Sequence, residues 1–254
     1  MSNPSVASSI DPSIVGRTDA AVGAKGYRGV AMEGSIARWY ARTRGTASQI
    51  EAWRVQAEAL VAELPAGAEV LEVAPGPGYF SVELARTGRV HVTSLEISRT
   101  FVAIANANAR AAGVLVAVRE GDASRMPFGP DSFDRVICQA AFKNFSRPQA
   151  AVNEMHRVLR PGGLAVIEDM RRDAPDALVR EEVRGMGLGR MRSYFTRRAL
   201  LSLRRRAYAA EDFARFARLS PFGRCSSQVV GIGLEIRFVK PAEEGGPGPP
   251  AAHA

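Results

Sequence analysis

The chain has 254 residues, 46% of them hydrophobic, which is enough apolar material for one domain with a sizeable core. A formal net charge of +8 raises nucleic acid as a partner, but lysine occurs only at positions 25, 143 and 240. Such an excess of arginine is typical of a GC-rich genome, so nucleic acid is not the expected partner. Cys138 and Cys225 form no redox or metal motif, and no segment is apolar for long enough to cross a bilayer. We expect a soluble, cytoplasmic protein.

The two ends of the chain differ in composition from the rest. Residues 1–25 are small and polar, and residues 241–254 are rich in proline and glycine, so both are expected to be mobile. Residues 26–240 form the expected domain. Within it, two amphipathic stretches in residues 26–66 predict helices that form a cap over a ligand site. Trp39 and Tyr40 either pack within this cap, or one of them closes over the ligand.

The segment VLEVAPGPGYFSVELA, beginning at Val70, runs from an apolar strand through a glycine-rich turn into a helix. Gly76 and Gly78 remove side chains where the backbone must approach a ligand, and the helix N-terminus presents free N–H groups. Glu72 places a negative charge beside the turn, which repels a pyrophosphate and attracts a cationic amino group. The pattern predicts a nucleotide-cofactor site, with Ala74 at the first position of the turn.

Further candidate ligand-binding residues follow the next two expected strands. RVHVTSLEIS ends at Glu96 and Ile97, about twenty residues past the glycine turn, where a carboxylate can bind both ribose hydroxyls. A helix, SRTFVAIANANARAAG, and a third strand lead to Asp122 and Ala123, where a carboxylate and an N–H group can bind the adenine edge. Ligands of doubly wound sheets bind outside the carboxyl ends of the strands, so these residues are expected at one site.

The second half of the chain continues the alternation of strands and helices. DSFDRVICQ predicts a fourth strand that ends at Gln139, and a helix ending in HRVLRPGG leads to a fifth strand, LAVIEDM. Residues 171–221 form an expected insertion with helices around YFTRRALLSLRRR and AAEDFARFARLS. RCSSQVV and IGLEIRFVK supply the final strands. The alternation predicts an α/β protein with three layers and a doubly wound sheet.

In order and spacing, these pieces resemble the class I S-adenosylmethionine-dependent methyltransferases over roughly residues 33–240. The family's glycine-rich motif corresponds to residues 72–78, although Ala74 stands where a glycine is usual, and its RVLRPGG turn corresponds to residues 157–163. The resemblance implies a Rossmann-like sheet of seven strands in the order 3-2-1-4-5-7-6, the last strand antiparallel, and S-adenosylmethionine as the cofactor. The cofactor-binding residues that follow are Tyr40, Glu72, Ala74, Gly76, Gly78, Glu96, Ile97, Asp122, Ala123 and Gln139.

The tract AFKNFSRPQAAVNEMHRVLRPGG is similar to the ubiquinone and menaquinone C-methyltransferase branch, but its middle differs, so the chemistry of that branch is not inherited. QAAFKN after the fourth strand offers neither the oxygen ligands of metal-dependent catechol enzymes nor the Asn/Asp-Pro-Pro-aromatic motif of base-amino methyltransferases. The expected acceptor is therefore a small hydrophobic or aromatic metabolite, as in secondary metabolism, methylated without a metal. Its acceptor atom, oxygen, nitrogen or carbon, stays open.

Acceptor-side residues are expected at the ends of the fourth and fifth strands and in the insertion. A base is needed only for a hydroxyl acceptor. The arginines of residues 197–206 either hold an anionic substrate group or form a solvated helix face, whereas His156 is expected to pack. The catalytic candidates are Glu168, Asp169 and Asn144, and the candidate substrate contacts are Phe142, Phe145, Tyr194 and Phe195.

Two other functions share parts of this pattern. An NAD-dependent oxidoreductase shares the glycine turn and the acid at Glu96, but it leaves Glu72, Asp122 and the RVLRPGG turn unexplained. A cyclase or binding subunit with the same cofactor site would have the same residues there. Detection of a methylated product separates this last alternative from a methyltransferase. A homodimer is also compatible with the sequence.

Overall fold

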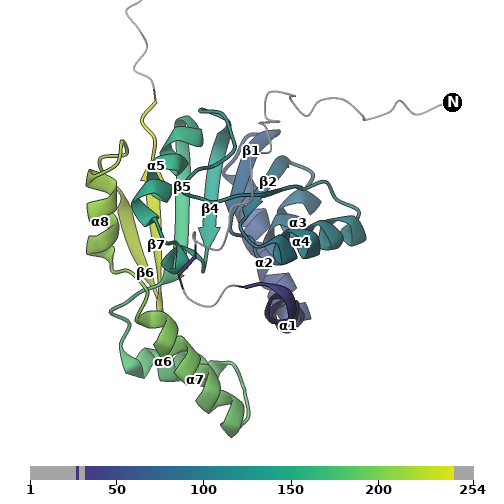
Figure 1. Cartoon of the computed structure of the whole chain (residues 1–254), viewed down its shortest axis with the longest axis vertical. Coiled ribbons are helices and arrows are strands. Elements are labelled where there is room, and N and C mark those ends of the chain that lie inside the picture. The colour runs from purple at the N-terminus through teal and green to yellow at the C-terminus, as the bar shows by residue number, and fades with distance from the viewer. Residues whose placement is uncertain (1–26, 29–31, 243–254) are drawn as a thin grey trace, which may run out of the picture.

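A seven-stranded mixed sheet forms the centre of the computed structural model, which describes residues 27–28 and 32–242 (Figure 1). The strand order is β3-β2-β1-β4-β5-β7-β6, as predicted. Strands β1 to β5 are parallel to one another, and β7 pairs antiparallel with both β5 and β6. The expected mobile ends lie outside the described residues, apart from positions 241 and 242. The strands are Ala68–Val73 (β1), Val90–Glu96 (β2), Ala117–Glu120 (β3), Phe133–Gln139 (β4), Leu159–Met170 (β5), Ser226–Val230 (β6) and Gly233–Val239 (β7).

Helices cover both faces of the sheet, and helices α1, α6 and α7 lie at the carboxyl ends of the parallel strands (Figure 1). Helices α2, α3 and α4 lie on one face, and α5 and α8 lie on the other. No helix among the described residues is long and apolar enough to cross a membrane. The helices are Gly34–Arg44 (α1), Ala47–Ala62 (α2), Tyr79–Arg86 (α3), Arg99–Ala112 (α4), Phe142–Asn144 (η3, a 3-10 helix), Pro148–Val158 (α5), Asp176–Gly185 (α6), Arg190–Arg204 (α7) and Ala210–Arg218 (α8).

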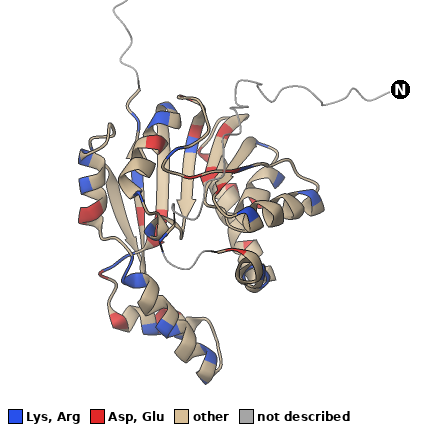
Figure 2. Ribbon diagram, in the orientation of Figure 1, with Lys and Arg blue, Asp and Glu red and all other residues tan. Residues whose placement is uncertain are grey.

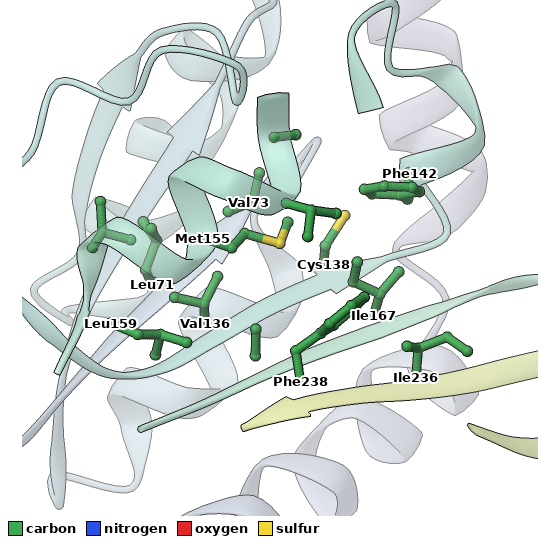
Figure 3. Packing of buried hydrophobic residues seen from close by; sticks show 14 of the residues in the cluster. Leu71, Val73, Val136, Cys138, Phe142, Met155, Leu159, Ile167, Ile236 and Phe238 are labelled. Carbon is green, nitrogen blue, oxygen red and sulfur yellow. The ribbon is translucent and has the colours of Figure 1, made fainter. Parts of the chain in front are cut away.

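Alternate residues of β1 divide between two cores, as the period of two in a strand requires. Leu71 and Val73 pack with Met155 of α5 in the larger core (Figure 3), whereas Val70 packs with Phe80 of α3 in the smaller one. Full burial of a large apolar side chain contributes about 1.5–3 kcal/mol. Because both faces of β1 are buried in this way, its carboxyl end is a rigid base for the glycine turn.

The segment expected to form one insertion, residues 171–221, divides into two parts. Helices α6 and α7 pack on each other and extend beyond the carboxyl ends of the strands (Figure 1), and α6 was not predicted. Helix α8 instead covers the sheet, because Phe213, Phe216 and Ala217 form a buried stripe at helical spacing that packs in the larger core. The part at the ligand end of the sheet therefore consists of α6 and α7 alone.

Candidate active site

The carboxyl ends of β1, β2, β4 and β5 open into a cavity of about 1020 Å³. This volume slightly exceeds the usual range for ligand pockets, about 300–1000 Å³, and leaves room for a nucleotide cofactor together with a small second molecule. Helix α1 and the end of α7 contribute the remaining walls. The predicted site residues that line this cavity are Tyr40, Glu72, Ala74, Gly76, Glu96, Ile97, Asp122, Ala123, Gln139, Asn144, Phe145 and Asp169.

The glycine turn after β1 holds three residues with positive φ, at Ala74 (59°), Gly76 (57°) and Gly78 (75°). The backbone N–H of Gly76 donates to Glu96 Oε2 at 2.9 Å and the residue lines the cavity. Gly78 does not line it. A Cβ there would lie 2.8 Å from the Cβ of Ala105 on α4, so glycine is required by helix packing and a left-handed backbone. The structure thus gives Gly78 a packing role, and its assignment as a cofactor contact stays a prediction.

Glu72, at the base of the cavity, is buried beside two serine hydroxyls. Ser81 Oγ donates to Glu72 Oε2 and lies 2.7 Å from Ser94 Oγ. Burial raises the pKa of Glu72 to about 7, and the charge of Glu96 adds to this rise, while the hydrogen bond from Ser81 opposes it. A cationic group bound nearby would favour the ionised form, because an opposite charge stabilises a carboxylate.

Glu96 ends β2 and connects the glycine turn to the start of α4. Its Oε2 accepts from the Gly76 N–H and its Oε1 accepts from the Ser98 N–H, each at 2.9 Å. Burial raises its pKa although these backbone hydrogen bonds oppose the rise. Each carboxylate oxygen can accept a second hydrogen bond. The pair of oxygens that faces the cavity thus fits a ligand with two adjacent hydroxyls, as predicted from the position of Glu96.

Asp122 lies after β3, at the side of the cavity. Its Oδ1 accepts from the N–H and hydroxyl of Ser124 at 2.8 and 2.7 Å, and its Oδ2 accepts from Arg147 at 2.9 Å. Burial alone would raise the pKa of Asp122, but these hydrogen bonds and the Arg147 charge outweigh burial and the pKa is lowered. The carboxylate therefore stays ionised and fixed, so it can accept a proton donor of a ligand ring beside Ala123.

Helix α1 is attached to the cavity wall by Glu33, which the sequence reading did not single out. The Glu33 carboxylate accepts from the N–H groups of Arg99 and Thr100 at 2.9 and 3.2 Å, at the start of α4. An acidic side chain at a helix N-terminus is stabilised by the helix dipole. Tyr40 then lies edge-on to Phe101, with ring centroids 5.9 Å apart. The N-terminal cap is thus held on the same loop that positions Glu96.

A buried ion pair lies at the opposite end of the cavity. Lys143 Nζ donates to Asp169 Oδ1 at 2.7 Å and also to the carbonyl of Ala140. The Lys143 backbone N–H donates to Asp169 Oδ2 at 2.8 Å, and the Met170 N–H donates to Oδ1 at 2.7 Å. Lys143 was not predicted as a site residue. A rare lysine directly after the fourth strand is the signal that could have indicated it.

Four acceptor-side predictions do not agree with the structure. Phe142 is fully buried among aromatic residues of the larger core, and Tyr194 and Phe195 lie exposed on the first turns of α7. Glu168 accepts from Gln56 of α2 and from Gln139, and it lines a smaller adjoining hollow. Periodicity indicates which residues share a helix face but not which partner that face meets.

Phe145 and Asn144 do reach the cavity, where apolar residues predominate. Asn144 is buried, and its Oδ1 has no hydrogen-bond partner among the described residues.

No three His, Cys, Asp or Glu side chains come together as metal ligands within residues 27–28 and 32–242. His156 packs edge-on against Phe222, with centroids 4.8 Å apart, and burial lowers its pKa. Other apolar residues of the wall include Ile36, Trp39, Met170, Leu200, Leu203 and Ile232.

Residues 71–167 match the model of a methyltransferase domain family. The match covers less than half of the chain, which has the class I S-adenosylmethionine-dependent methyltransferase fold. The cofactor of this class is S-adenosylmethionine. The residues present fit it, because Glu96 has two oxygens at the cavity with unused acceptor capacity and Gly76 leaves an open backbone next to them.

Individual known proteins agree with this class. The chain is 37% identical over 99 residues to a demethylmenaquinone methyltransferase of Deinococcus radiodurans, covering 39% of this chain and 41% of that protein. It is 38% identical over 107 residues to a ubiquinone/menaquinone biosynthesis C-methyltransferase of Roseobacter denitrificans, covering 41% and 43%. The matched stretch thus spans less than half of either relative. A methyltransferase structure from Aquifex aeolicus superimposes with a TM-score of 0.59 at 16% identity, covering 80% of this chain and 97% of that one.

Proposed function

We propose that the protein transfers a methyl group from S-adenosylmethionine to a small, largely apolar acceptor. One observation carries this proposal: a single cavity has two unlike halves. The half at the ends of β1, β2 and β3 has acids and an open glycine turn, and the half at the ends of β4 and β5 is mainly apolar. The volume of about 1020 Å³ accommodates two molecules side by side.

The polar half supplies a complementary group for each part of the cofactor. Glu96 accepts the two ribose hydroxyls, and Asp122 with the N–H of Ala123 binds the adenine edge. Glu72 lies on the side of the turn where the amino-acid part would extend, and its negative charge complements an ammonium group. Tyr40, packed on Phe101, covers this half from α1.

The bound cofactor supplies an electrophilic methyl group on a positively charged sulfur. The acceptor would supply the electron pair for the new bond to the methyl carbon, from a lone pair on oxygen or nitrogen or from a π bond at carbon, and would lose one proton. S-adenosylhomocysteine would leave with the electrons of the former carbon–sulfur bond. The walls from α1, η3 and α7 align the two molecules and exclude water. Alignment of this kind lowers a barrier by up to about 7–11 kcal/mol. A general base is not obligatory.

Asp169 acts through Lys143 in this proposal. Its carboxylate already accepts three hydrogen bonds, one of them from the Lys143 ammonium, so its oxygens are occupied by groups of the chain. Its role is to hold the Lys143 ammonium at the cavity wall, where that charge stabilises an acceptor oxygen as it loses its proton. Glu168, which holds α2 through Gln56, has no part in the reaction.

An acceptor screen with S-adenosylmethionine labelled on the methyl group tests the proposal. Quinols and hydroxylated aromatic compounds come first, because the names of two relatives refer to quinone methylation. The expected result is label transfer to an apolar acceptor without added metal, with S-adenosylhomocysteine as the second product. Binding of S-adenosylmethionine without label transfer to any acceptor class would instead favour a non-methylating role, and no binding would contradict the proposal.

A further inference from the structure

We infer that the acceptor carries an anionic group, such as a carboxylate, beside its apolar body, and that Arg206 binds this group. The inference rests on the proposed function, since it concerns the acceptor half of the same cavity. It starts from the arginines around the end of α7, which form a basic stretch beside the carboxyl ends of the strands (Figure 2).

Only one arginine of residues 197–206 lines the cavity, and this is Arg206. Arg204 pairs with Asp176 of α6 at 2.6 Å, and Arg198 donates to Tyr194 Oη at 3.2 Å on the exposed face of α7. Arg205 is exposed. Arg197, like Arg206, has a buried Nε without a partner among the described residues, but it does not line the cavity. Arg206 is therefore the arginine of this stretch that is placed to meet a ligand.

Arg206 has no acidic partner among the described residues. Its one hydrogen bond is a long one, from Nη1 to the carbonyl of Arg28 at 3.4 Å, and its Nε is buried without a partner. A buried N–H of a charged group without a hydrogen bond is unfavourable, because its lost hydration is not replaced. The Arg206 charge also acts on Tyr27, whose pKa is raised by burial while the Arg206 charge opposes that rise. Such a guanidinium is suited to an anion from outside the chain.

Two of the other cations that line the cavity already pair with acidic side chains within the described part of the chain. Lys143 pairs with Asp169, and Arg99 pairs with Glu120 at 2.9 Å. Arg44 lies over the ring of Tyr40, with its Cζ 5.2 Å from the centroid, in the cofactor half. A negative charge on the acceptor therefore meets an unneutralised cation in the acceptor half only at Arg206.

A second polar group without a partner faces the same region. Arg28 connects the two, because its N–H donates to the carbonyl of Asn144 at 2.6 Å while its own carbonyl accepts from Arg206. Asn144 is 8% exposed, and its Oδ1 is unpartnered. A guanidinium binds a carboxylate with two parallel hydrogen bonds, and the Asn144 Oδ1 can accept a hydrogen bond from a hydroxyl next to that carboxylate. Leu200 and Leu203, on the same helix end, contact the apolar body.

Calorimetry with matched probes tests the inference. The probes are 4-hydroxybenzoic, 4-hydroxycinnamic and 1-hydroxy-2-naphthoic acids, each paired with its carboxamide, titrated into protein saturated with S-adenosylhomocysteine. At least one acid is expected to bind at least tenfold more tightly than its amide. The variant Arg206→Gln should abolish this preference, and the adjacent exposed control Arg205→Gln should retain it.

Two further readouts separate the possible failures. Arg206→Gln should keep the wild-type affinity for S-adenosylhomocysteine, because Arg206 lies in the acceptor half, and this result shows that the variant is folded. Amides that bind as tightly as the acids, an acid preference that persists in Arg206→Gln, or no saturable binding of any acid would each overturn the inference. Methyl transfer to neutral acceptors alone would overturn it while leaving the proposed function intact, whereas failure to bind S-adenosylhomocysteine would contradict the proposed function itself.

Discussion

At the scale of single residues, Glu72 couples stability to pH. Burial raises its pKa from 4.5 to about 7, so the folded state binds this proton more tightly than the unfolded chain does. The stabilisation is fully present below pH 4.5 and is lost as the pH rises to about 7. The free energy of unfolding of ligand-free protein should therefore fall over this range by on the order of 3 kcal/mol from this group.

Urea unfolding of the wild type and of Glu72→Gln at several pH values measures this contribution. The glutamine keeps a hydrogen bond with Ser81 but does not titrate, so the difference in stability between the two proteins isolates Glu72. A difference that stays constant between pH 4.5 and 7 would show that the carboxyl group is not perturbed. S-adenosylmethionine affinity should rise over the same range, because the ionised form pairs with the cofactor's ammonium group.

Substitutions at the two glycines of the turn should have different effects: one should mainly weaken cofactor binding, and the other should mainly lower the free energy of unfolding. Gly76→Ala places a Cβ at a cavity-lining position whose nearest atom lies 4.0 Å away, so it should weaken cofactor binding about tenfold or more while the strain of positive φ costs about 1 kcal/mol. Gly78→Ala should instead cost about 1–3 kcal/mol of stability, because its Cβ meets Ala105. Thermal unfolding and calorimetry on both variants distinguish these effects.

A companion substitution provides the control for Gly78. Ala105→Gly removes the opposing Cβ, so the double variant should recover the steric part of the loss but not the part due to positive φ. Ala74 is a reference for the cost of positive φ, since it already has a φ of 59°. The variant Ala74→Gly should change the free energy of unfolding by less than about 1 kcal/mol. Full cofactor loss in Gly78→Ala with unchanged stability would support the prediction that Gly78 contacts the ligand.

Residue by residue, the cofactor half was more predictable than the acceptor half. Glu72, Glu96 and Asp122 were predicted because each lies within a residue or two of the end of a parallel strand, and strand ends converge at one edge. A Cβ on Gly78 would clash with Ala105, and Lys143 forms an ion pair with Asp169. In each case the two residues are about 26 positions apart in the sequence. Packing between such distant segments leaves no local pattern.

At the scale of elements, α1 depends on the start of α4 for its position. Glu33 accepts from two N–H groups there, and hydrogen bonds to a charged group contribute about 1.5–3 kcal/mol. Glu33→Ala should increase amide hydrogen exchange in α1 at least tenfold and weaken cofactor binding, since Tyr40 is carried by this helix. Glu51→Ala, which removes an exposed partner of Arg54 on α2, is the matched control.

Hydrogen exchange followed by mass spectrometry resolves the peptides of α1 from those of α2. Equal exchange of α1 in Glu33→Ala and Glu51→Ala would show that the carboxylate does not hold the cap.

The same contact of Glu33 with α4 makes stability depend on pH with the opposite sign to that of Glu72. The Glu33 pKa is lowered, because hydrogen bonds from Thr100 and Arg99 outweigh burial, so its stabilisation is lost as the pH falls below 4.5.

Element existence was easier to predict from sequence than element partnership. The strands and most helices follow from apolar runs and helical periodicity, but α6 was missed and α8 was placed with the wrong neighbours. Helix α8 has a strong amphipathic pattern that predicts a buried stripe and nothing about the surface that covers it. The exposed aromatic pair on α7 was misassigned for the same reason, because an aromatic residue in an insertion can face either side.

At the scale of the whole molecule, the sheet order follows from resemblance, whereas the shape of the cavity follows from the segments that surround the sheet. The carboxyl ends of the strands supply the floor, and α1 and α7, which are far apart in the sequence, supply walls (Figure 1). This arrangement explains why motif order predicts the cofactor class but not the acceptor. The acceptor half is built mostly from side chains outside the family's motifs.

The most direct test of the central claim is a calorimetric titration of S-adenosylhomocysteine into the wild type and into Glu96→Ala. The wild type should bind with micromolar affinity. The variant should lose about 2–3 kcal/mol, roughly a thirty- to hundredfold weaker affinity, because both ribose hydroxyls lose a charged acceptor. Equal affinity of the two proteins, or no binding by the wild type, would contradict the cofactor site at the ends of β1 and β2.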